Sequence, residues 1–172
     1  MLRLALAFVD IALHRRGPEE LPASTFLLVL VLAASLLAAF AALQLAPPLE
    51  QRAALLLAFD TAVYGGFIWG VLKAFDHGPR FKQTATALFG TDALLNLLSL
   101  PLLLWTRGLD SVGAATTAPT IFRLLLIAWS IDIAGYVLSR GIGRPYVLGV
   151  SIMIGYVLLM ISLQTSLFPA DS

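Results

Sequence analysis

Four ionisable side chains lie inside long apolar segments of this sequence: Asp60, Asp92, Arg123 and Asp132. Burying such a residue in hydrocarbon costs roughly 2.5–3.5 kcal/mol on insertion scales, so a residue of this kind is a functional candidate by default. Each one therefore needs a chemical interpretation and a structural interpretation.

Asp60 and Arg123 are expected near the same face of a membrane. At 1.5 Å per helical residue they lie about 10 Å and about 6 Å below its boundary. If their helices touch, the guanidinium reaches the carboxylate, and the ion pair fixes how the two helices pack. Alternatively, the long side chain of Arg123 extends to the membrane surface.

Asp92 and Asp132 are expected at similar depths from the opposite boundary, with no basic residue deep in the apolar core beside them. Either they lie in a wet vestibule, or at least one is neutral, because a low dielectric penalises the charged form. Such a pair could carry protons or cations. The structural alternative is a pair of neutral carboxylic acids that hydrogen-bond across helices.

Other polar residues stand one helical turn from these carboxylates. A phenol four residues after an aspartate can donate a hydrogen bond to it. This spacing occurs twice, in Asp60 with Tyr64 and in Asp132 with Tyr136. Asp92, Asn96 and Ser99 share one helical face, which should point into a bundle. Gln164 is a further uncharged polar residue inside an apolar segment.

Enzyme chemistry finds little support in the sequence. There is no cysteine, and the two histidines, His14 and His77, fall outside the apolar segments. No glycine-rich phosphate loop, zinc-protease helix or nucleophile elbow is present. We therefore expect a protein that is not an enzyme, with no catalytic residue, no cofactor, no metal site and no nucleic-acid partner.

The composition identifies the class of protein. Of 172 residues, 59% are hydrophobic and 12% charged, and the mean hydropathy is +0.91. Soluble domains carry roughly 25% charged residues. So much apolar surface cannot be hidden in one small core, which indicates an integral membrane protein.

Five apolar runs are long enough to cross a hydrocarbon core, which takes about 20 helical residues. They cover residues 24–45, 53–73, 84–105, 119–138 and 146–167. Residues 1–16 have apolar and polar positions at helical spacing and are predicted to form an interfacial helix, lying on the leaflet or packing on the ends of the spans. The sequence thus predicts one all-α membrane domain over 1–172: a five-helix bundle preceded by a short amphipathic helix.

The basic residues predict the orientation, because cytoplasmic loops carry the excess of Lys and Arg. Eight of the eleven lie on one side: Arg3, Arg15, Arg16, Lys73, Arg80, Lys82, Arg140 and Arg144. Only Arg52 and Arg107 lie on the other. We expect a bacterial inner-membrane protein with its N-terminus in the cytoplasm and its C-terminus outside. Arg15, Arg16, Arg80 and Lys82 are candidates for contact with anionic lipid headgroups.

Small residues at four-residue spacing indicate close helix contacts, within the chain or between chains. Three spans carry such pairs: Ala34 with Ala38, Gly66 with Gly70, and Ser151 with Gly155. Pro101 interrupts the third span and is expected to kink it.

The segment Gly78-Pro79-Arg80-Phe81-Lys82-Gln83-Thr84, followed by an apolar helix containing Pro101, resembles the central part of bacterial Yip1-domain membrane proteins. The plan of five spans with a cytoplasmic N-terminus is similar too. The resemblance implies a role in membrane organisation or partner binding and transfers no catalytic residue.

Two functions follow as hypotheses. The first is a non-enzymatic accessory subunit or scaffold that works with lipids, with other membrane proteins or with further copies of itself. The alternative is a small oligomeric transporter, or a proton- or cation-conducting protein, that uses the intramembrane aspartates. A membrane enzyme ranks third.

Overall fold

The computed structural model describes residues 2–45, 53–109 and 117–167, and over these ranges the chain is helical with no strand. The six α-helices are α1 (Leu2–Ala12), α2 (Thr25–Leu45), α3 (Ala53–Ala74), α4 (Phe81–Leu109), α5 (Thr117–Gly141) and α6 (Tyr146–Leu167). Two short 3-10 helices, η1 (Pro18–Glu20) and η2 (Gly78–Arg80), precede α2 and α4. The five helices α2 to α6 are long and apolar enough to cross a membrane. The all-α class and the number of candidate spans are therefore confirmed.

Two helices extend well beyond their predicted apolar spans. The third apolar run lies inside α4, which has 29 residues and continues through Pro101. The fourth lies inside α5, which has 25 residues. Polar residues at their ends stay helical because backbone hydrogen bonds, unlike hydropathy, do not stop at the edge of an apolar run.

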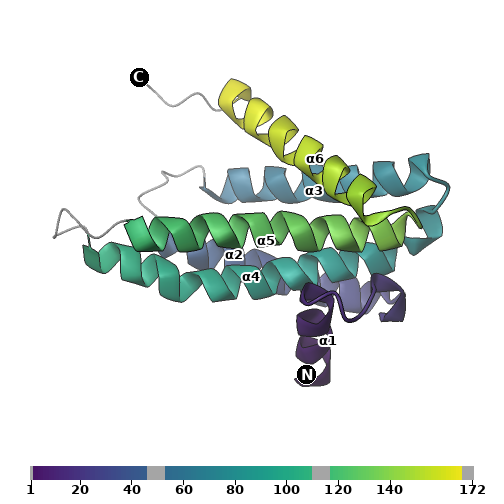
Figure 1. The fold of residues 1–172 in the computed structure, drawn as a ribbon, viewed down its shortest axis with the longest axis horizontal. Helices are drawn as coiled ribbons and strands as arrows, with labels where there is room; N and C mark the ends of the chain where they lie inside the picture. The colour runs from purple at the N-terminus through teal and green to yellow at the C-terminus, as the bar shows by residue number, and fades with distance from the viewer. Residues whose placement is uncertain (1, 46–52, 110–116, 168–172) are drawn as a thin grey trace.

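Helices α2 to α5 run up and down along the long axis of the molecule, and α6 crosses them at an angle (Figure 1). Helix α4 is central, because it contacts α1, α2, α3 and α5, whereas α6 packs chiefly on α5. Along α2, the residues that become buried are Leu27, Val31, Ser35 and Ala38, one stripe of the helix. Many large apolar side chains on the outer faces of the described helices stay exposed.

The tightly packed core lies at one end of the bundle. Ile68 and Leu72 near the end of α3 pack with Leu88 near the start of α4, and all three are almost completely buried. Val137 and Leu138 near the end of α5 belong to the same cluster. The most buried side chains thus gather where α3 and α5 end and α4 begins. At the opposite end of the bundle fewer of the described side chains are buried, so that end is packed less densely.

Helices α1, α3 and α5 end in the same backbone motif, in which two amide groups donate back to carbonyls of the last turn. For α1 the bonds run from His14 N to Ile11 O at 2.9 Å and from Arg15 N to Asp10 O at 2.8 Å. The motif needs a left-handed residue, usually glycine. Gly143 fills that position after α5, whereas His14 fills it after α1 with φ +58°.

Helix α1 runs at a steep angle to the long helices and projects from the side of the bundle (Figure 1). Phe8 packs against Gly90 of α4, where a Cβ atom would collide with the phenyl ring. Ile11 is buried, while Leu6 and Leu13 on the other side stay exposed. The helix therefore packs on the spans with one apolar face and leaves a second apolar face uncovered.

Helices α5 and α6 approach each other closely at two glycines that carry no predicted contact motif. A Cβ atom on Gly149 would collide with the carbonyl oxygen of Gly135, and one on Gly135 would lie 2.7 Å from Val150 Cα. By contrast, nothing lies within 4 Å of a Cβ placed on Gly66, Gly70 or Gly155. The prediction that Gly66, Gly70 and Gly155 make close helix contacts within the chain is therefore wrong.

Candidate functional site

A cavity of about 840 Å³ occupies the less densely packed half of the bundle, and all five long helices contribute to its lining. Its ionisable lining residues are Asp60 of α3, Asp92 of α4 and Arg123 of α5. A second cavity of about 370 Å³ shares Asp60 and Asp92 with the first, together with Asn96, Ser130 and Gln164. These shared polar residues therefore lie where the two cavities adjoin.

The local sequence explains why space remains at this end. Two of the three side chains that helix α2 contributes to the cavity, Ala39 and Ala42, are small, and the third is Leu43. Helix α6 touches α5 most closely at Gly149, near its own start, and diverges from α5 toward its C-terminal end (Figure 1). Because α5 and α6 separate toward the C-terminal end of α6, a space remains between them there.

Asp92 is held by a neighbouring helix. The hydroxyl group of Ser35 on α2 donates to Asp92 Oδ2 at 2.5 Å. Within α4, Asn96 Nδ2 donates to the carbonyl oxygen of Asp92 at 3.0 Å, and Ser99 Oγ donates to the carbonyl oxygen of Asn96 at 2.7 Å. All three predicted residues of this face line the larger cavity. Ser35 is a site residue that the sequence analysis missed, since one serine in an apolar helix carries no spacing signal.

Asp60 binds Gln164 and not Arg123. The amide nitrogen of Gln164 on α6 donates to both carboxylate oxygens of Asp60, at 3.0 and 3.2 Å. Both Asp60 and Arg123 belong to the described residues, and no ion pair joins them. The predicted ion pair is therefore wrong: similar depth along two helices does not bring side chains together when a third helix supplies a closer partner. Arg123 is exposed and lines the larger cavity.

The predicted tyrosine–aspartate pairs within helices are not formed. Tyr64 packs edge-to-face on Phe89, with ring centroids 5.7 Å apart, and lines the smaller cavity. The hydroxyl group of Tyr136 lies 3.5 Å from the carbonyl oxygen of His14 instead of on Asp132. A phenol places its hydroxyl group a full ring beyond Cβ, so tertiary neighbours decide where it binds.

Asp132 lies away from the cavities and has a basic partner after all. His14 Nε2 lies 3.2 Å from Asp132 Oδ2, and the hydroxyl group of Tyr146 on α6 donates to Asp132 Oδ1. The imidazole ring stacks on Tyr136 with centroids 4.2 Å apart. Asp132 lines neither cavity, so the expected pairing of Asp92 with Asp132 at one site is wrong. Neither partner has a sequence signal, because His14 belongs to the N-terminal segment before the first apolar run and Tyr146 is the first residue of the last run.

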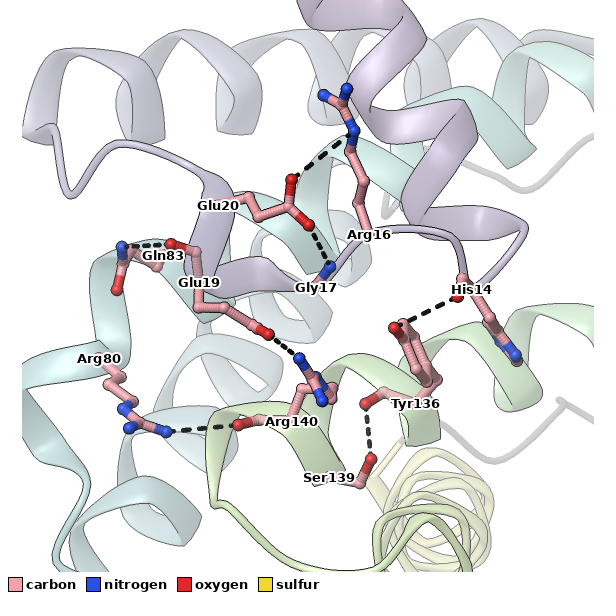
Figure 2. A network of polar contacts seen from close by, with 10 residues as sticks. All are labelled: His14, Arg16, Gly17, Glu19, Glu20, Arg80, Gln83, Tyr136, Ser139 and Arg140. Atoms are coloured by element: carbon pink, nitrogen blue, oxygen red, sulfur yellow. Dashed lines mark hydrogen bonds and ion pairs between the residues drawn. The ribbon is translucent and has the colours of Figure 1, made fainter.

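A network of polar contacts ties residues 14–21 to the ends of α4 and α5 (Figure 2). Arg140 of α5 donates to Glu19, and its carbonyl oxygen accepts a bond from Arg80 at 3.5 Å. Gln83 Nε2 of α4 donates to the carbonyl oxygens of Glu19 and Leu21, the latter at 2.8 Å. The segment between α1 and α2 is therefore fixed to the spans.

The same network accounts for two of the four headgroup candidates. Arg16 lies 3.3 Å from Asp10 and 3.7 Å from Glu20, and Arg80 binds the backbone of α5. Arg15 and Lys82 are exposed. Contact with lipid headgroups stays a prediction for all four residues.

Among the described residues, no group of three or more metal-ligating side chains could hold a metal ion. Comparison with protein-family models, with curated proteins and with solved structures gave no match. The resemblance to Yip1-domain proteins therefore stays a prediction, and function must be argued from the cavity.

Proposed function

We propose that this protein binds a small cation in the larger cavity and passes it across the membrane, which is the transport alternative raised by the sequence. The observation that carries the proposal is the convergence of Asp60 and Asp92 on one cavity. The sequence offered Asp92 and Asp132 for this role, and Asp60 takes the place of Asp132. Intramembrane carboxylates that face a cavity are typical of ion and substrate pathways.

The chemistry of the lining supports a cation as the ligand. Asp60 and Asp92 supply carboxylate oxygens, and Asn96 and Ser130 add uncharged polar groups where the two cavities adjoin. Such groups suit a monovalent metal ion or a protonated amine. A volume of about 840 Å³ leaves room for an organic molecule.

The uneven packing of the bundle supports access from one side. The cavity occupies the half of the bundle where α3 and α5 begin, while Ile68, Leu72 and Val137 fill the other half. In the orientation that the basic residues favour, the cavity faces the outside of a bacterial inner membrane and the filled half faces the cytoplasm. In this arrangement α1 lies in the cytoplasmic interface, with Leu6 and Leu13 toward the acyl chains.

The proposal is tested with the purified chain in lipid nanodiscs, using sodium, potassium and ethanolamine as probes. We expect Asp60→Asn and Asp92→Asn each to weaken binding of the preferred probe at least tenfold, about 1.4 kcal/mol. Asp132→Asn is the matched control, because it removes a carboxylate that lies outside both cavities. Unchanged binding in both cavity variants, with melting temperatures near that of the wild type, would exclude the proposal.

A second candidate function, an accessory or scaffold subunit, is favoured by the open glycines. Gly66 and Gly70 on α3 and Gly155 on α6 have no neighbour within 4 Å of an added Cβ, so another helix could approach closely there. Purification in mild detergent tests this function: a partner protein or a homo-oligomer that Gly70→Leu releases supports it. A monomer that Gly70→Leu leaves unchanged contradicts it.

A further inference from the structure

Arg123 gives the cavity a second charge of opposite sign to its aspartates. Of the described residues that line the cavity, Arg123 is the only lysine or arginine, and no ion pair joins its guanidinium to another residue of the ranges that the structure describes. An unpaired cation within a membrane span is unfavourable unless water or an anionic group meets it. The arginine is therefore placed to receive an anion.

The positions of the charges along the cavity differ. On α5 the lining runs from Pro119 to Ser130, about 16 Å of helix. Ser130 lines both cavities, together with Asp60 and Asp92, whereas Arg123 lines only the larger one. Arg123 is seven residues closer to the start of α5 than Ser130, about 10 Å along the helix axis. Passing along α5, a ligand thus meets a positive group first and reaches the negative groups deeper inside.

We propose that the ligand of this cavity is a zwitterion, with an ammonium group that binds at Asp60 and Asp92 and an anionic phosphate or carboxylate that binds at Arg123. This inference rests on the proposed cation site and adds the class of ligand. A simple cation leaves Arg123 without a partner, and a simple anion faces two carboxylates. A zwitterion satisfies both charges, since guanidinium groups bind phosphate and carboxylate well.

Two sources share this chemistry: a free zwitterion in solution and the headgroup of a zwitterionic phospholipid. The apolar part of the lining, which includes Leu43, Leu56 and Leu102, accommodates an acyl chain as well as a solute. The charges of the cavity thus recognise an ammonium group joined to an anionic group. Whether these groups belong to a solute or to a lipid is decided by the experiment.

The test compares three soluble probes on the chain in nanodiscs of phosphatidylglycerol: ethanolamine, glycerol phosphate and glycerophosphoethanolamine. We expect glycerophosphoethanolamine, which carries both charges, to bind at least tenfold more tightly than either single-charge probe. Arg123→Gln should abolish that preference while ethanolamine still binds. Asp60→Asn should weaken the binding of both ethanolamine and glycerophosphoethanolamine. Thermal melting of each variant shows that the bundle is intact.

The outcomes separate the two proposals. If ethanolamine binds in an Asp60-dependent way but glycerophosphoethanolamine binds no better, or if Arg123→Gln keeps the preference, the zwitterion inference is wrong and the cation site stands. If Asp60→Asn changes nothing for any probe, both are wrong. Competition by nanodiscs containing phosphatidylethanolamine, but not by those with phosphatidylglycerol alone, assigns the site to a lipid headgroup. Equal binding of the soluble probe in both assigns it to a free solute.

Discussion

His14 Nε2 lies 3.2 Å from the carboxylate of Asp132, although His14 follows the short N-terminal helix and Asp132 belongs to the fourth long helix. The backbone of His14 adopts the left-handed conformation, with φ +58°, at the position where α1 ends. A non-glycine residue in that conformation costs about 1 kcal/mol or more. The contact with Asp132 and the stacking on Tyr136 offset this cost and fix α1 to α5.

Replacing His14 with alanine should therefore loosen α1. The chain has no cysteine, so a single cysteine at Ile11, which is 1% exposed, reports on the opening of α1 through its rate of maleimide labelling. We expect His14→Ala to raise that labelling rate about tenfold, which corresponds to a loss of about 1.4 kcal/mol in the free energy that holds α1 against the bundle. His77→Ala is the control, because the His77 imidazole lies 2.6 Å from the carbonyl oxygen of Phe75 within its own turn. Equal labelling in all three proteins would contradict the docking role.

The partner of Asp60 can be identified with double-mutant cycles. Because Gln164 donates to both oxygens of Asp60, we expect Asp60→Asn and Gln164→Leu to couple by about 1 kcal/mol in thermal melts in detergent. Asp60→Asn and Arg123→Gln should be additive, since no ion pair joins them. Coupling with Arg123 and none with Gln164 would contradict this part of the structure.

The crossing of α5 and α6 should tolerate no side chain. We expect Gly149→Leu to lower stability by about 1–3 kcal/mol, because a Cβ there collides with the backbone of Gly135. Gly155→Leu on the same helix is the matched control: nothing lies within 4 Å of its Cβ, so it should change stability by less than about 0.5 kcal/mol. The measurement is the melting temperature in detergent. Equal losses for both variants would show that the crossing does not lie at Gly149.

The orientation can be tested with fusion reporters. A periplasmic reporter fused after Ser172 should be active, and the same reporter inserted at His77 should be inactive, because the basic residues near His77 favour the cytoplasm. A cytoplasmic reporter at the same two positions should show the reverse pattern and serves as the control. Periplasmic activity at His77 would overturn the proposed orientation, and with it the placement of the cavity on the outer side.

The long helices could be predicted from the sequence because the signal is local. An apolar run of about 20 residues specifies a span whatever its neighbours are. The predicted ends of α4 and α5 are less accurate, because the backbone hydrogen bonds of each helix continue past the end of its apolar run. The face with Asp92, Asn96 and Ser99 was also visible, because one helix alone sets that spacing.

The partners of the polar groups could not be predicted in the same way. Depth along a helix says nothing about the helix's rotation or its neighbours. Depth alone therefore pairs Asp60 with Arg123, whereas its partner in the structure is Gln164. Hydropathy gives Asp132 no basic partner, whereas His14 reaches it from outside the apolar runs. Such contacts depend on which helices adjoin, and that depends on where their backbones approach closely.

The sequence by itself determined that this is an all-helical chain with five segments able to span a membrane, because length and hydropathy act segment by segment. Only the tertiary structure decided that Asp60, Asp92 and Arg123 line one cavity and that Asp132 does not. The physical reason is the packing of whole helices: Gly135 and Gly149 draw α5 and α6 together near the start of α6. The helices then diverge, and the space they leave unfilled is lined by charges from different parts of the chain.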